Sequence, residues 1–146
     1  MEFAVRIHFV ERLGFELERV DPGECEIRLE LREELTNSWS VAHGGVTMTL
    51  LDVAMAHAAR SPESAGGGLQ PGVVTVEMKT SFMRPGEGLL VATGRRLHRT
   101  ASLAFCEGSV HDREGRLVAH ATGTFKYLKG LPVGGGRRVQ RIDGTD

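Results

Sequence analysis

The sequence predicts an α+β fold in which one long, buried helix is wrapped by a strongly curved antiparallel sheet. Two observations predict this class. Residues 46–59 are apolar on nearly every side, and their content of Ala, Leu and Met favours helix over strand. Six strand-like segments surround this run, and turn residues separate them. A helix that is apolar nearly all round must be buried nearly all round, and the sheet supplies the cover.

The elements are expected in a simple order along the chain. Phe3, Ile7 and Val10 have helical spacing among charged neighbours, so a short amphipathic helix is predicted over residues 2–13. A β-hairpin follows, with its turn at Asp21-Pro22-Gly23, and its second strand alternates apolar and charged residues. Four more strands follow the long helix, and their short connections predict antiparallel neighbours. The six predicted strands span residues 15–20, 24–31, 73–82, 89–97, 102–111 and 117–128.

The chain is expected to form one domain over residues 1–130, followed by a flexible tail over residues 131–146. The tail contains Gly134-Gly135-Gly136 and lacks periodicity. Its Arg137, Arg138 and Arg141 are expected to be solvated. A sheet of six strands leaves one side of the long helix short of cover, so burial alone predicts that two subunits pair.

Composition narrows the possible classes of function. The chain has 146 residues and a formal net charge of −1, which gives no electrostatic reason to expect nucleic acid or a membrane as a partner. The first residues are charged and no run reaches the roughly 20 apolar residues of a membrane span, so a cytoplasmic protein is expected. Cys25 and Cys106 stand far apart in strand-like runs and are expected to be inert core residues. The scattered histidines show no metal-site spacing, so neither a metal nor a cofactor is expected.

A single carboxylate, Asp52, interrupts the most apolar helix of the chain. Burying a charge costs on the order of several kcal/mol unless the charge is paired or hydrogen-bonded. Leu or Ala at this position would avoid that cost if the residue had only a structural role. An acid in such surroundings is a candidate functional group with a perturbed pKa. The local pattern leaves a structural alternative open, in which Asp52 faces a solvent channel or bonds a backbone amide.

Two glycines, Gly44 and Gly45, stand at the start of this helix. They leave space for a substrate beside the first backbone N–H groups, which can stabilise a developing oxyanion together with the helix dipole. Asp52 lies about two turns, or roughly 12 Å, further along the same helix. If both groups act on one carbonyl, Asp52 must reach the Gly44 of a partner subunit.

These residues carry a family resemblance. His43-Gly44-Gly45 followed by Asp52, with Asn37 six residues before His43, resembles the PaaI-type acyl-CoA thioesterases of the hotdog superfamily. The resemblance covers about residues 10–129 and implies the hotdog fold. It also implies hydrolysis of acyl-CoA to free acid and coenzyme A without a cofactor. The implied assembly is a homodimer, often a dimer of dimers and so a homotetramer, with active sites at the subunit interface.

The resemblance assigns roles to residues at matching positions. Asp52 matches the base or nucleophile, Gly44 the backbone donor that polarises the thioester carbonyl, and Asn37 the side chain that orients water or the carbonyl. His43 and Gly45 match positions that shape the loop beside the substrate. The six residues expected to contact substrate are His43, Gly45, Thr80, Ser81, Arg84 and Arg99.

Four of these residues lie further along the chain. Thr80 and Ser81 lie near the position of a hydroxyl that holds the nucleophilic water, and the sequence does not choose between them. Arg84 stands at a strand end on the implied coenzyme A path, and Arg99 belongs to a cluster with Arg95 and Arg96 that could bind phosphates.

Two other functions are alternatives to acyl-CoA hydrolysis. One is a non-catalytic acyl-CoA-binding or sensor protein, which would have no use for an acid beside the thioester. The other is a hotdog hydratase that pairs an acid with a histidine. Asp52 and His57 lie five residues apart, so a regular helix places them about 140° apart and on different faces. The acyl group, the choice between nucleophile and general base, and the choice between dimer and tetramer are not decided by the sequence.

Overall fold

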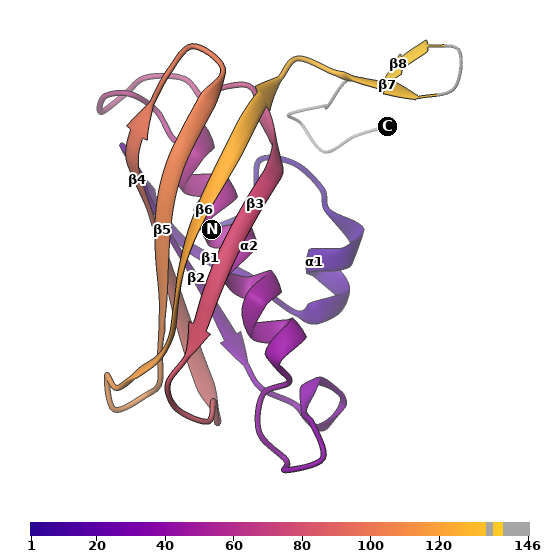
Figure 1. Ribbon diagram of the computed structural model, residues 1–146, viewed down its shortest axis with the longest axis vertical. Helices are drawn as coiled ribbons and strands as arrows, with labels where there is room; N and C mark the ends of the chain where they lie inside the picture. The colour runs from indigo at the N-terminus through magenta and orange to yellow at the C-terminus, as the bar shows by residue number, and fades with distance from the viewer. Residues whose placement is uncertain (134–135, 139–146) are drawn as a thin grey trace.

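The computed structural model describes residues 1–133 and 136–138 and confirms the predicted fold class. Figure 1 shows a curved sheet wrapped around one long helix, α2. Helix α1 spans His8–Leu13, α2 spans Gly44–Arg60, and the short 3-10 helix η1 spans Glu33–Leu35. The strands of the main sheet are β1 Glu16–Asp21, β2 Glu24–Glu30, β3 Gly72–Phe82, β4 Leu89–Arg99, β5 Leu103–His111 and β6 Leu117–Leu128.

The sheet is antiparallel throughout, with the strand order β1-β2-β4-β5-β6-β3. The prediction that all four later strands are consecutive neighbours is therefore wrong for β3, which pairs with β6 instead of β4. Residues 83–88 connect β3 to β4, and such a connection spans up to about 20 Å when extended. Three strand spacings amount to only about 14 Å. A short connection can therefore cross the end of the sheet, and it leaves β3 as an edge strand.

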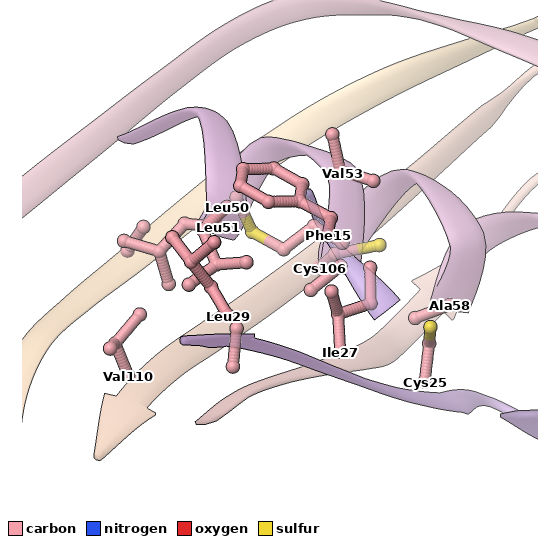
Figure 2. Packing of buried hydrophobic residues seen from close by; sticks show 14 of the residues in the cluster. Phe15, Cys25, Ile27, Leu29, Leu50, Leu51, Val53, Ala58, Cys106 and Val110 are labelled. Atoms are coloured by element: carbon pink, nitrogen blue, oxygen red, sulfur yellow. The ribbon is translucent and has the colours of Figure 1, made fainter. Parts of the chain in front are cut away.

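The core lies between α2 and the concave face of the sheet. Leu50, Leu51 and Met55 of α2 are fully buried there, and Figure 2 shows the first two packed with residues of β2 and β5. The helix approaches β4 so closely at Gly94 that a Cβ atom would lie 2.2 Å from the carbonyl oxygen of Ala54. This close approach explains why the strand carries a glycine at that point.

The two cysteines are free and buried in this core, as the sequence predicts. Cys25 and Cys106 both pack beside α2 (Figure 2). Burial raises the pKa of each thiol to about 12, because a thiolate would have to lose its hydration. Both thiols therefore remain protonated and unreactive near neutral pH.

The first helix is shorter than the predicted 2–13 and begins at His8. Ile7 precedes it in an extended conformation and makes no side-chain cap, so nothing continues the helix toward the N-terminus. The apolar residues Phe3, Val5 and Ile7 are still half-buried or buried, and Phe3 and Ile7 pack against the core. Residues 1–7 therefore form an N-terminal arm held by apolar contacts.

One side of α2 is not covered by its own chain. Gly45 is exposed, and Met48, Thr49, Asp52 and Ala56 are only half-buried. These positions recur at helical spacing and form one stripe along the helix. The uncovered side predicted from the sequence is thus present, and Asp52 lies on it.

The end of the chain differs from the predicted tail in one short part. Residues Leu131–Val133 form β7 and pair with β8, Gly136–Arg138. The rest of the predicted tail, residues 134–135 and 139–146 with Arg141, lies outside the described residues. Within the described part of the chain, no helix is long and apolar enough to cross a membrane.

Candidate active site

The carboxylate of Asp52 lies half-buried in the middle of α2 and faces β3. Thr75 of β3 donates its hydroxyl proton to Asp52 Oδ1 across 2.6 Å. Among residues 1–133 and 136–138, no cation lies within salt-bridge distance of this carboxylate, and no backbone amide bonds it. Burial raises the pKa of Asp52, and the smaller effect of the Thr75 hydrogen bond lowers it. The carboxylate is thus a proton acceptor stronger than an ordinary Asp.

Sequence reasoning missed Thr75, and a β-bulge explains why. The register of β3 against β6 shifts between Thr75 and Glu77, so Val76 is an extra residue in the strand. Because of the bulge, Thr75 before it and Met78 and Thr80 after it all face α2. A strict two-residue alternation cannot place all three on one face. Only the pairing partners of β3 reveal the shift.

Thr80 and Ser81 follow each other in β3 beyond the bulge, so strand alternation places the two candidate hydroxyls on opposite faces. Thr80 pairs with the buried Ala121 on the inner face, and its Oγ1 is buried without a hydrogen-bond partner in the described residues. Ser81 pairs with His120 and is exposed on the outer face. Of the two hydroxyls, only that of Thr80 therefore points toward the helix.

His43 caps the N-terminus of α2. Its Nδ1 accepts a hydrogen bond of 2.9 Å from the backbone N–H of Gly45, and its carbonyl oxygen accepts from Val46 and Thr47. A Cβ at Gly45 would lie 3.1 Å from this nitrogen, so glycine makes room for the cap. Because Nδ1 is an acceptor here, the proton of the neutral ring is on Nε2. His43 thus fixes the geometry of the helix start.

This cap leaves one backbone donor of the first turn available. The N–H of Gly44 has no partner among the described residues, whereas that of Gly45 is bound to His43. A Cβ at Gly44 would touch the ring of Phe82 at an ordinary 3.6 Å. The fold itself therefore does not require glycine at position 44, and the small residue keeps the N–H accessible.

Asn37 organises the loop that leads into α2. Its Oδ1 accepts hydrogen bonds from the backbone N–H groups of Trp39 at 2.9 Å and Val41 at 3.4 Å. Its own backbone N–H donates to the carbonyl oxygen of Val41. The side-chain amide NH₂ of Asn37 has no partner within the described structure, so it is the part of the residue that can still donate.

The two arginines predicted to contact phosphate lie at opposite ends of α2. Arg84 is exposed near the helix N-terminus and donates to the carbonyl oxygen of Leu117 at 2.8 Å. Arg99 lies near the C-terminus, where it pairs with Glu63 and stacks 4.2 Å above the ring of Tyr127. The 17 residues of α2 separate these ends by about 25 Å. Within one subunit, Arg99 therefore does not share a site with Gly44.

The other arginines of the predicted cluster serve the fold. Arg96 donates to the carbonyl oxygens of Ala59 and Ser61 at 3.2 and 3.0 Å and so binds the C-terminal end of α2. Arg95 forms an ion pair with Glu107. Neither guanidinium is directed at the start of the helix.

His57, the histidine of the rival hydratase function, is bonded within its own helix. The Nδ1 atom of His57 bonds the carbonyl oxygen of Val53 at 2.8 Å, and its ring packs edge-on against Phe3 at 5.0 Å. His57 therefore does not pair with Asp52. In the part of the chain that the structure describes, no group of three or more His, Cys, Asp or Glu side chains could hold a metal ion.

Comparisons with known proteins identify a family for the chain. A family model described as the thioesterase superfamily matches residues 40–119, more than half of the chain. Human acyl-coenzyme A thioesterase 13 is 31% identical over 111 residues, which cover 73% of this chain and 74% of that protein.

Two solved structures also share the fold. A conserved protein of Pseudomonas aeruginosa superposes with a TM-score of 0.77 at 28% identity, over 86% of this chain and 97% of that chain. The PaaI protein of the E. coli phenylacetic acid degradation operon superposes with a TM-score of 0.76 at 20% identity, over 92% of this chain and 89% of that chain. The predicted resemblance is confirmed: the chain belongs to the thioesterase superfamily, has the hotdog fold, and is a thioester hydrolase.

Proposed function

We propose that the protein hydrolyses an acyl-CoA thioester to a free acid and coenzyme A, with Asp52 as the catalytic carboxylate. The observation that carries this proposal is the environment of Asp52, which is half-buried, has no cation partner in the described structure, and lies on the uncovered side of α2. The human relative of this protein, acyl-coenzyme A thioesterase 13, supports coenzyme A as the leaving group. A raised pKa brings the carboxylate closer to the working pH of a general base.

The chemistry needs few groups because a thioester is already activated toward attack. As a general base, Asp52 accepts a proton from water while the water oxygen bonds to the thioester carbon. The carbonyl oxygen becomes an oxyanion and accepts a hydrogen bond from the free N–H of Gly44. The intermediate then breaks its C–S bond, and Asp52 returns the proton to the departing thiolate. As a nucleophile, Asp52 would instead bond to the thioester carbon and expel the thiolate of coenzyme A. Water would then hydrolyse the mixed anhydride to the free acid and the restored Asp52 carboxylate.

The two proposed groups lie too far apart to act within one subunit. Asp52 is about 12 Å along α2 from Gly44, whereas both must lie close to the same carbonyl. The edge strand β3 offers a pairing surface, because its outer edge has no neighbouring strand in the described sheet. Val76 and Phe82 of β3 and Met83 just after it are 57%, 53% and 48% exposed. We propose that β3 of one subunit pairs with β3 of another around a two-fold axis. Such a homodimer covers the uncovered side of α2 and brings Asp52 toward the partner's helix start.

Substrate contacts follow from the same placement. Thr80 is proposed to hold the attacking water, because its buried hydroxyl faces α2 and lacks a partner within the described residues. The free amide of Asn37 is proposed to orient the carbonyl or the water. Arg84 lies at the same end of α2 as Gly44 and is proposed to bind a phosphate of coenzyme A. Arg99 is a weaker candidate for phosphate because Glu63 already neutralises it.

The test compares wild type with Asp52→Asn on a panel of aromatic and aliphatic acyl-CoAs, following release of free thiol. Removing the catalytic charge is expected to lower kcat by about two or more orders of magnitude. The matched control is Glu77→Gln on the outer face of β3, where the carboxylate accepts from Thr124, and it is expected to keep wild-type turnover. Circular dichroism checks that both variants fold.

Two outcomes would contradict the proposal. Equal turnover in wild type and Asp52→Asn would exclude Asp52 as the catalytic carboxylate. Acyl-CoA binding by wild type without thiol release across the whole panel would favour the acyl-CoA-binding function instead.

A further inference from the structure

The C-terminal end of α2 carries a buried charge that the proposed reaction does not use. Arg60 is only 5% exposed. Throughout residues 1–133 and 136–138, its guanidinium has neither a hydrogen-bond acceptor nor an ion-pair partner, and its Nε is completely buried. Burial lowers the pKa of Arg60, which reflects the cost of holding this charge away from water. A buried arginine without an acceptor requires an explanation.

A second unpaired polar atom lies on the same face of the helix. His57 precedes Arg60 by three residues, so the two side chains are neighbours on α2. Its Nδ1 bonds the carbonyl oxygen of Val53, and its Nε2 is buried without a partner in the described structure. Two buried polar atoms without partners in the described structure, His57 Nε2 and Arg60 Nε, therefore lie on this face of the helix beside the N-terminal arm.

Both side chains line a small cavity between α2, β1 and the N-terminal arm. Its volume is about 140 Å³, and its walls are mostly apolar. That volume corresponds to roughly five water molecules at about 30 Å³ each. Glu2 also lines the cavity, but its carboxylate makes no ion pair with Arg60. Ala4, Leu17, Val20 and Leu69 form its apolar wall beside His57 and Arg60.

We propose that this cavity binds a small aliphatic monocarboxylate of about three or four carbon atoms. The carboxylate would accept hydrogen bonds from Arg60, and the alkyl chain would pack against Leu17, Val20 and Leu69. An anion with one apolar end matches the unpaired Arg60 guanidinium and the mostly apolar walls beside it, and Met1 and Glu2 complete the lining. Inorganic phosphate carries oxygen atoms on every side and would leave several of them without donors here.

This site is separate from the proposed catalytic site. Arg60 lies about 12 Å along α2 from Asp52, and His57 points about 140° away from Asp52 around the helix axis. The proposal does not rest on the proposed catalysis, because neither Asp52 nor Gly44 lines the cavity.

The test measures butyrate binding to the full chain by calorimetry and by NMR at constant ionic strength. Saturable binding with a Kd on the order of millimolar is expected, with signal changes concentrated at the His57 imidazole and the Arg60 Nε–H. Arg60→Met keeps the bulk and removes the charge, and it is expected to weaken binding by about tenfold or more. The matched control Arg95→Met removes an exposed positive charge elsewhere and is expected to leave the Kd within about twofold of wild type.

A second variant and the wild-type spectra keep the test decisive if Arg60→Met fails to fold. Ala4→Leu fills the cavity without changing any charge and is expected to abolish butyrate binding. The proposal is overturned if wild type shows no saturable changes at His57 and Arg60, or if Ala4→Leu binds butyrate like wild type. Tighter binding of inorganic phosphate than of butyrate would overturn the carboxylate assignment.

Discussion

Thr75 donates a hydrogen bond of 2.6 Å to the carboxylate of Asp52, and this bond joins the edge strand β3 to the middle of α2. The hydroxyl opposes the effect of burial, because it stabilises the charged form of the carboxylate that burial disfavours. The strand that we propose as the dimer interface therefore also lowers the pKa of the proposed catalytic carboxylate.

Thr75→Val is expected to raise the pKa of Asp52 further, because it removes the donor and keeps the size and β-branching. If ionised Asp52 is the base, the acidic limb of the kcat/KM profile then moves to higher pH. The control is Thr124→Val, which removes a similar hydroxyl–carboxylate bond to Glu77 on the outer face. A pH profile of thiol release measures both variants, and an unmoved limb in Thr75→Val would contradict the role given to Asp52.

Asp52→Asn is expected to stabilise the fold near neutral pH, on the order of 1 kcal/mol. The pKa of Asp52 is higher in the folded than in the unfolded protein, so the folded state holds this proton more tightly. The contribution of Asp52 to the free energy of unfolding is therefore fully present below the pKa that Asp52 has in the unfolded protein. This contribution is lost as the pH rises through the pKa of the folded protein. Thermal unfolding at several pH values measures the effect. The gain should disappear in acid, and a gain that is equal at all pH values would contradict this explanation.

Gly44→Pro tests the oxyanion donor without changing a side-chain charge. Proline removes the backbone N–H but suits the first residue of a helix, and His43 before it has φ −60° and ψ 135°, which proline tolerates. We expect kcat for thiol release to fall by about 100- to 1,000-fold. Gly44→Ala keeps the N–H and should retain far more activity, so equal losses in the two variants would point to a steric effect instead.

Mixing two inactive variants tests whether each site combines two subunits. In a heterodimer of Asp52→Asn and Gly44→Pro chains, one site contains both changes and the other contains neither. Random re-pairing after mild denaturation should therefore restore about a quarter of wild-type activity. Re-paired homodimers of each single variant are the controls. Absence of recovery in folded, re-paired dimers would contradict a site built from Asp52 of one subunit and Gly44 of its partner.

His43→Ala is expected to lower the free energy of unfolding by about 1 kcal/mol, because the side chain caps α2. His43→Asn restores a preferred cap residue and should recover most of the loss. Since His43 is not proposed as a base, His43→Asn should also keep thiol release near the wild-type rate. Denaturant unfolding and the thiol assay measure the two effects, and a large loss of activity in a stable His43→Asn variant would contradict a purely capping role.

Local periodicity was enough to predict the six strands of the main sheet, the long helix α2 and the position of Asp52 within it. Two-residue alternation marks β2, and an almost continuous apolar run marks α2, because each pattern reports directly which sides of an element are buried. The same pattern made Asp52 conspicuous, since a lone carboxylate contrasts with its apolar neighbours. These inferences need only residues close together in the chain.

Tertiary structure decided every relationship that depends on pairing between distant segments. The place of β3 beside β6, the bulge at Val76 and the bond from Thr75 to Asp52 follow from strand register. The separation of Arg84 from Arg99 follows from the length of α2. Sequence spacing cannot reveal such contacts, because strand order and burial arise from long-range packing, and that packing also left Arg60 without an acceptor in the described structure.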